Sequence, residues 1–122
     1  MRHLYSALLY CLLPLALARL LWRSRRAPGY RRRLGERFGF YPQPAPGGSP
    51  VIWVHAASVG EVAAVARLVE RLLSDYPGGN VVVTTTTPTG SQRVNALFGD
   101  RVSHVYCPWD LPGAVRRFLR WA

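Results

Sequence analysis

Residues 51–61 read Val51-Ile-Trp-Val-His-Ala-Ala-Ser-Val-Gly-Glu61. An apolar run rich in β-branched and aromatic residues, typical of a buried strand, stops at a turn of small residues. A single carboxylate follows at the position where a helix would begin. In an open α/β sheet such a junction lies at the carboxyl end of a strand, where ligands bind. The stretch therefore predicts the first βα unit of a parallel sheet, with a site at its edge.

Three strand–helix pairs are expected from residue 51 onward. The first strand, about 51–57, precedes a helix over 59–75 whose apolar residues recur at helical spacing. A second strand is expected over 80–86, and Thr87-Pro88 then starts a helix that runs to about 98. A third strand over 102–106 precedes a helix that Asp110 would cap. Strands alternating with helices in this way predict the α/β class, with three right-handed βα units in a Rossmann-like parallel sheet over residues 51–122.

The N-terminal segment is apolar over a membrane-spanning length. Residues 4–22, LYSALLYCLLPLALARLLW, carry one charge, Arg19, and about 20 such residues cross a bilayer as a helix. We expect residues 1–22 to be an uncleaved anchor helix, single-spanning or monotopic, because the arginines that follow would hold the C-terminal side in the cytoplasm. A signal peptide cleaved near Ala16-Leu17-Ala18, and an interfacial or buried helix, stay open as alternatives.

The positive charge is concentrated beside this segment. The formal net charge is +10, all sixteen basic residues are arginine, and nine of them lie in residues 1–40 with one of the six acids. Charge placed this way favours anionic lipid or a phosphorylated substrate as partner over nucleic acid, whose binding face would spread over a folded surface.

Residues 23–50 read as a basic juxtamembrane linker that ends in a boundary rich in Pro and Gly. One interpretation is that this stretch determines membrane topology and also binds anionic lipid. The sharper hypothesis adds contacts to substrate phosphates from four arginines. These arginines are Arg31, Arg32, Arg33 and Arg37. Glu36, the only acid of this stretch, is expected to pair with a nearby arginine.

Three motifs follow the anchor and an RLGERFGF segment (33–40): HAASVGE (55–61), TTTTPTGSQRV (84–94) and HVYCPWDLPGAVRRFL (104–119). In this order and spacing they resemble the 3-deoxy-D-manno-octulosonic acid (Kdo) transferases of lipopolysaccharide assembly. The resemblance implies a GT-B glycosyltransferase at the cytoplasmic side of the Gram-negative inner membrane. It implies inverting transfer of Kdo from CMP-Kdo to the lipid A precursor, lipid IVA.

By the same resemblance, residues 51–122 would be part of the acceptor domain. The CMP-Kdo-binding donor domain of such enzymes is not included in these 122 residues. We therefore expect the chain to be the front part of a larger enzyme, and to be inactive alone.

The resemblance assigns the catalytic base to the glutamate of the S-[VI]-G-E turn, which is Glu61. A sugar hydroxyl is a poor nucleophile until a base takes its proton, and Glu61 stands at the predicted crevice. The structural alternative is a capping box, Ser58-Val-Gly-Glu61, in which Glu61 reaches back to the Ser58 amide.

Acceptor contacts are expected around Glu61 and along the threonine-rich edge after the second strand. Gly60 would let a bulky acceptor approach closely. For His55 a satisfied core histidine is the alternative, and for the threonine-rich edge a capped βα loop. The expected residues, besides the four arginines, are His55, Ser58, Gly60, Thr87, Thr89, Gly90 and Ser91.

No cofactor and no metal are expected, since arginines and helix N-termini would hold the phosphates. The sequence has no Asp-x-Asp pair, its histidines are scattered, and Cys11 and Cys107 lack metal-ligand spacing. Two other functions stay open: another membrane-associated GT-B glycosyltransferase with a different lipid acceptor, and a non-catalytic membrane-anchored interaction module. The pattern predicts nothing about oligomeric state.

Overall fold

The computed structural model describes residues 2–122, so the first residue of the expected anchor lies outside the described part of the chain. The chain divides into two compact units. Unit 1 comprises Met1–Phe40 and Pro108–Arg120, and unit 2 comprises Tyr41–Cys107 and Trp121–Ala122. This division cuts across the expected ranges, because most of the last helix belongs with the N-terminal residues.

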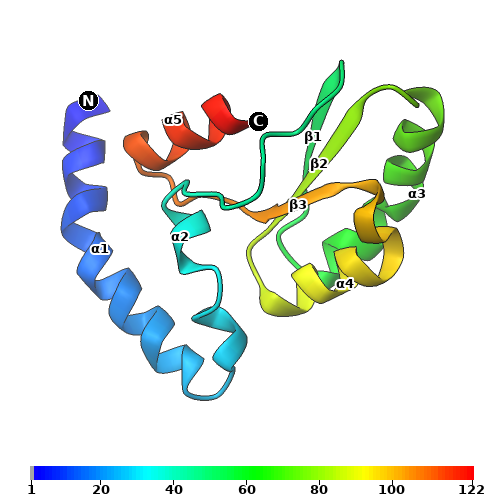
Figure 1. Ribbon diagram of the computed structural model, residues 1–122. Helices are drawn as coiled ribbons and strands as arrows, with labels where there is room; N and C mark the ends of the chain where they lie inside the picture. The colour runs from blue at the N-terminus through cyan, green and yellow to red at the C-terminus, as the bar shows by residue number, and fades with distance from the viewer. Residues whose placement is uncertain (1) are drawn as a thin grey trace. The chain divides into compact units, whose positions relative to one another are not determined.

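Unit 2 is built on a parallel sheet of three strands in the order β1-β2-β3 (Figure 1). The strands span Val51–His55, Asn80–Thr85 and Ser103–Tyr106. The register places His55 of β1 beside Thr84 of β2. The predicted α/β class with a parallel sheet is therefore confirmed, and each strand ends within two residues of its expected bounds.

Helices α3 (Val59–Asp75) and α4 (Pro88–Phe98) follow β1 and β2 and begin and end at the predicted residues. Ser58 caps α3 by accepting the Glu61 N–H, and Thr87 caps α4 by accepting the Gly90 N–H. Both helices lie on the same face of the sheet (Figure 1), as two right-handed crossovers in the order β1-β2-β3 require.

The core of unit 2 lies between that face and the two helices. It is almost entirely aliphatic, and its members alternate along each strand with residues of the opposite face. On that opposite face the side chains of Trp53 and His55 are exposed, while Thr84 is buried. The buried core residues are Ala56, Val62, Val69, Val81, Val83, Val94, Phe98 and Val102.

The residues just before β1 are folded onto unit 2. The ring of Tyr41 lies 4.7 Å from that of Trp121, centroid to centroid. The Trp121 indole N–H donates to the carbonyl of Gln43 at 3.0 Å. The Pro/Gly-rich boundary is therefore attached to the sheet unit at its start.

Unit 1 contains α1 (Arg2–Ser24), α2 (Leu34–Arg37) and all of α5 (Pro112–Trp121) except its last residue, with a 3-10 turn, η1, at Pro28–Tyr30. By length and composition α1 could cross a membrane over His3–Ser24. The short α2 lies inside the expected linker.

The segment after α2 packs closely on α5. The Arg117 guanidinium donates to the Phe38 carbonyl at 2.8 and 2.6 Å. A Cβ on Gly39, whose φ is +80°, would lie 2.5 Å from the Ala114 carbonyl oxygen, so this approach requires glycine. Part of the basic stretch is thus a packed structural element.

Candidate functional site

The candidate site lies at the carboxyl ends of β1 and β2, where two βα loops are bonded to each other. The backbone N–H of Thr86 and its hydroxyl both donate to the carbonyl oxygen of Ala57, at 3.0 and 2.9 Å. The Ala56 N–H donates to the Thr84 carbonyl at 2.9 Å. The loop that carries Glu61 is therefore fixed by the loop that follows β2.

The Glu61 carboxylate lies over the turn between β1 and α3. Its Oε2 accepts the backbone N–H of Ala57 at 2.8 Å, and the Ser58 hydroxyl lies 3.5 Å from Oε1. The Glu61 N–H is 3.4 Å from the Ser58 hydroxyl oxygen. A capping box is thus formed, but the amide that it binds belongs to Ala57 and not to Ser58 as expected. Ser58 is extended, and the amide within reach of the carboxylate is one residue earlier.

This bond leaves the carboxylate open to a ligand. Glu61 is exposed to solvent, and an ionised carboxylate offers about four lone-pair sites, of which the Ala57 N–H and the Ser58 hydroxyl take two. The capping role and the role of a base therefore do not exclude each other. A hydroxyl that approaches from solvent could donate to the remaining lone pairs.

His55 and Gly60 flank this carboxylate along the chain. His55 is exposed, so the alternative of a core histidine is wrong, although its Nδ1 lies 2.9 Å from the Thr84 hydroxyl oxygen. That hydroxyl also accepts the Trp53 indole N–H at 2.9 Å. At Gly60 an added Cβ would meet nothing nearer than the Ser58 hydroxyl at 4.0 Å, so the packing of this chain does not require glycine there.

The threonine-rich loop is a capped βα loop, and most of its predicted contact residues face inward. Thr87 caps α4, while Gly90 and Ser91 are buried and Thr89 is exposed. A Cβ on Gly90 would lie 3.0 Å from the Thr87 hydroxyl oxygen and 3.4 Å from the Ser58 carbonyl carbon. Thr86 belongs to the predicted threonine-rich edge, but its bonds to the Ala57 carbonyl, which fix the loop of Glu61, could not be predicted from the sequence.

The four arginines of the basic stretch have different surroundings. Arg33 binds the buried Glu36 carboxylate in bidentate fashion, at 2.7 and 2.9 Å, as the expected pairing of Glu36 predicts. Arg37 is buried, whereas Arg31 is exposed and donates to the Ser24 hydroxyl at 2.7 Å. Arg32 is exposed. Of the four, Arg31 and Arg32 are therefore the two that a large ligand could reach.

Two further ionic features lie outside the site. Arg101, in the 3-10 turn η2 (Gly99–Arg101), donates to both carboxylate oxygens of Glu70 on α3, at 2.8 and 2.7 Å. These hydrogen bonds lower the pKa of Glu70. Asp110 does not cap the last helix: α5 begins at Pro112, its cap position falls on Leu111, and the Asp110 carboxylate accepts the Tyr5 hydroxyl.

Over the described residues 2–122, no three His, Cys, Asp or Glu side chains are grouped so that they could hold a metal ion. Metal-independent transfer stays a prediction. The geometry supplies a fixed, solvent-open carboxylate at the edge of a parallel sheet, which can accept a proton from an approaching hydroxyl.

Comparison with known proteins places this arrangement in a family. Residues 32–122 match the family model described as 3-deoxy-D-manno-octulosonic-acid transferase (kdotransferase). The chain belongs to the Kdo transferase family. The match covers the turn with Glu61, the threonine-rich loop and α5, and it confirms the resemblance that the motifs indicate.

Individual relatives agree with this family. The chain is 48% identical to a 3-deoxy-D-manno-octulosonic acid transferase from Haemophilus influenzae, over 98% of this chain and 28% of the relative. It is 40% identical to one from Bordetella pertussis (97% and 29%) and 36% identical to one from Chlamydophila psittaci (96% and 27%). The chain thus spans somewhat over a quarter of the length of these relatives. No solved structure matches it.

Proposed function

We propose that the protein containing this chain transfers Kdo from CMP-Kdo to the lipid A precursor, lipid IVA, with inversion and with Glu61 as general base. Membership of the Kdo transferase family supports the reaction class. The observation that carries the assignment of the base is the position of the Glu61 carboxylate, anchored by the Ala57 N–H at 2.8 Å and open to solvent.

The proposed step forms one bond and breaks one. A primary hydroxyl oxygen of the acylated disaccharide attacks the anomeric carbon of Kdo, while the bond from that carbon to the phosphate oxygen of CMP breaks. The hydroxyl proton passes to the Glu61 carboxylate, and CMP leaves with the electron pair of the broken bond. Attack on the face opposite the leaving group inverts the configuration at the anomeric carbon.

The hydrogen bond at Ala57 suits this role. A base must be held within hydrogen-bond distance of the proton that it takes, and the Ala57 N–H restricts the carboxylate to one side of the turn. Thr86 in turn holds the Ala57 carbonyl through two hydrogen bonds. The base is therefore positioned by the Ala57 backbone amide, and Ala57 is held by both the backbone and the hydroxyl of Thr86.

Two other groups are proposed to meet the acceptor. Gly60 leaves open space beside the base, and Arg32 and Arg31 present exposed guanidinium groups to phosphate. We place the protein at the cytoplasmic side of the inner membrane, where α1 could serve as anchor. Anionic membrane lipid is then a second partner of the basic stretch.

Replacement of Glu61 by Gln in the full-length protein tests the proposal. The amide oxygen of Gln can still accept the Ala57 N–H, so the turn is kept while the base is lost. We expect turnover with CMP-Kdo and tetra-acylated lipid A precursor to fall about 10²–10⁴-fold, with acceptor binding retained. The control is Glu70→Gln, which changes an exposed glutamate on the same helix. We expect this variant to retain the turnover of the parent enzyme. Near-normal turnover in Glu61→Gln would leave Glu61 with the capping role alone.

A further inference from the structure

The helix α1 has two different faces along its whole length. One face is partly or fully buried within unit 1, and its members are spaced three or four residues apart, as one side of a helix requires. They are Ser6, Leu9, Leu13, Leu17, Leu20 and Ser24. The rest of the described helix is exposed and mainly apolar: Leu4 is 81%, Leu15 67% and Trp22 63% exposed. An apolar surface of this extent marks a site of contact with lipid or another apolar partner.

Other parts of unit 1 lie beside α1 near its N-terminal end, around its middle and near its C-terminal end. Near the N-terminal end, the Tyr5 hydroxyl donates to the Asp110 carboxylate at 2.5 Å. Around the middle, Leu9 and Leu13 line a cavity of about 230 Å³ together with Trp109. Near the C-terminal end, Arg23 lines a second cavity, of about 200 Å³, again with Trp109.

This arrangement conflicts with a helix that spans the bilayer. Residues 4–22, at 1.5 Å per residue, would take up the full hydrocarbon thickness. Asp110 and the irregular segment around it would then lie inside the hydrocarbon, beside α1. Lipid-exposed irregular loops do not occur there, and a carboxylate at that depth is costly. A helix that lies along the membrane surface meets neither objection.

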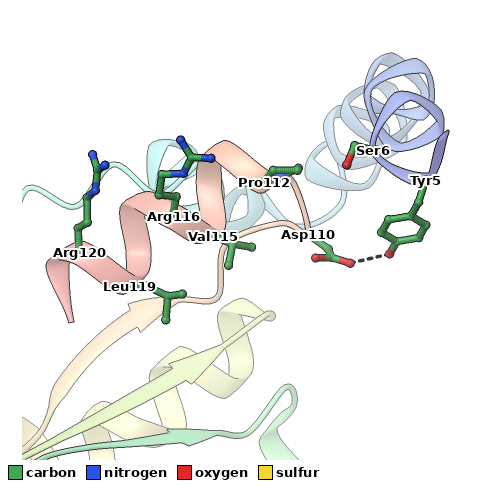
Figure 2. Close-up of a pocket in the computed structure, with 8 residues that line it drawn as sticks. All are labelled: Tyr5, Ser6, Asp110, Pro112, Val115, Arg116, Leu119 and Arg120. Atoms are coloured by element: carbon green, nitrogen blue, oxygen red, sulfur yellow. Dashed lines mark hydrogen bonds between the residues drawn. The ribbon is translucent and has the colours of Figure 1, made fainter. Parts of the chain in front are cut away.

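A groove of about 490 Å³ lies between the first turn of α1 and the length of α5 (Figure 2). Arg116 and Arg120 project together from one side of α5, and Val115 and Leu119 project from another. Both arginines are exposed, and neither has a hydrogen-bond or ion-pair partner among the described residues. The groove therefore offers apolar lining next to two free guanidinium groups.

The charge of unit 1 selects the partner. Its sequence ranges hold twelve arginines and two acids. Of the two acids, Glu36 is buried against Arg33 and Asp110 is bonded to Tyr5. An apolar helix face bordered by unpaired arginines is complementary to a leaflet that contains anionic phospholipid.

We propose that unit 1 docks on an anionic bilayer leaflet with α1 lying in the plane of the membrane, its exposed face in the acyl region and Arg116 and Arg120 on lipid phosphates. The proposal concerns the membrane-binding surface alone and holds for any reaction that the protein catalyses. It excludes a transmembrane α1.

Membrane sidedness tests the orientation of α1. In the full-length protein with every native cysteine, Cys11 and Cys107 among them, replaced by Ser, single cysteines are introduced by His3→Cys, Arg25→Cys and, as a marker in unit 2, Arg93→Cys. All three positions are exposed or surface-accessible in the structure. An impermeant maleimide is added to sealed spheroplasts and to inverted membrane vesicles. We expect all three cysteines to react in inverted vesicles and to be protected in spheroplasts. Reaction at position 3 from the side opposite position 93 would overturn the proposal.

Vesicle flotation tests the arginine pair. Arg116→Ser/Arg120→Ser should lower binding to vesicles of phosphatidylcholine with phosphatidylglycerol several-fold, and the loss should shrink in high salt. Binding to pure phosphatidylcholine should change little. The matched control is Arg67→Ser/Arg93→Ser, which removes two exposed arginines of unit 2. Thermal unfolding should show that both variants are as stable as the parent. An equal loss in both variants, or no loss in either, would overturn the proposed surface.

Discussion

The carboxylate of Glu61 accepts the backbone N–H of Ala57 at 2.8 Å, across the turn that joins β1 to α3. A general base and a capping residue are usually treated as alternatives for a glutamate in this position. Here a single conformation satisfies the helix terminus and leaves the carboxylate open to solvent. The two roles are therefore separable by substitution, because one needs a hydrogen-bond acceptor and the other needs a proton acceptor.

Glu61→Ala and Glu61→Gln should differ in stability. The alanine variant loses the hydrogen bond to Ala57, so the free energy of unfolding should fall by roughly 0.5–1.5 kcal/mol. The glutamine variant keeps an acceptor and should stay near the parent value. Denaturant unfolding of the full-length protein measures both. Equal stability of the two variants would mean that this bond does not hold the turn.

Gly60→Ala and Gly90→Ala should have opposite consequences. Gly60 has open space beside it, so alanine should leave stability unchanged or raise it by up to about 1 kcal/mol. The acceptor KM should nevertheless rise several-fold, because the new methyl group stands beside Glu61. Gly90 has the Thr87 hydroxyl 3.0 Å from an added Cβ, so alanine there should cost roughly 1–3 kcal/mol. An unchanged acceptor KM in Gly60→Ala would remove Gly60 from the acceptor site.

Arg32→Ser and Arg33→Ser separate ligand binding from folding. Arg32 is exposed, and its loss should raise the acceptor KM and alter its salt dependence while the unfolding midpoint stays constant. Arg33 holds the buried Glu36 carboxylate, so its loss should lower stability by roughly 1–3 kcal/mol. Kinetics at two salt concentrations, together with thermal unfolding, distinguish the two effects. If Arg32→Ser leaves the KM unchanged at low salt, that residue does not contact the acceptor.

The pair of Glu70 and Arg101 should give a defined pH dependence of stability. Hydrogen bonds from Arg101 lower the pKa of Glu70 from its ordinary value of 4.5, so the folded state binds this proton less tightly than the unfolded state. The contribution of this pair to the free energy of unfolding is therefore complete above pH 4.5. It is lost as the pH falls through the lower pKa of Glu70 in the folded state. The stability difference between the parent and Glu70→Gln should be largest near neutral pH and should vanish in acid. A difference that grows in acid would contradict this sign.

Addition of EDTA to the full-length enzyme should leave turnover unchanged. The proposed step takes its base from Glu61 and its phosphate contacts from arginine, and neither requires a divalent ion. Turnover is compared before and after the chelator and again after Mg²⁺ is added back. If EDTA lowers turnover and Mg²⁺ restores it, the metal-free mechanism is wrong.

Local signals in the sequence located the helices of unit 2 accurately. Ser58 before α3 and Thr87-Pro88 before α4 are capping patterns that act within a few residues, and both helices begin where these patterns predict. The strand bounds differ by one or two residues, because a strand ends where its neighbour stops pairing with it. The amide that binds the Glu61 carboxylate also differs from the expected one by one residue. The extended backbone of Ser58 brings the Ala57 N–H, and not that of Ser58, to the carboxylate.

Contacts between distant residues were not visible in any local pattern. The edge-to-face contact of Phe38 with Trp109, 5.1 Å between ring centroids, joins the basic stretch to the segment before α5. Arg117 bonds to Phe38 across 79 residues of sequence. The sequence predicted a linker at 23–50 because its composition is basic and rich in Pro and Gly, whereas these contacts fold residues up to Phe40 into unit 1.

The sequence by itself determined the α/β class, the bounds of α3 and α4, the apolar character of α1 and the family motifs around Glu61. Each of these depends on periodicity, capping or residue order within a short window. Only the tertiary structure decided that Thr86 and Glu61 bind the same residue, Ala57, and that one face of α1, from Ser6 to Ser24, is half-buried or buried within unit 1. Both depend on which distant segments come into contact, and that is set by packing over the whole fold rather than by local preference.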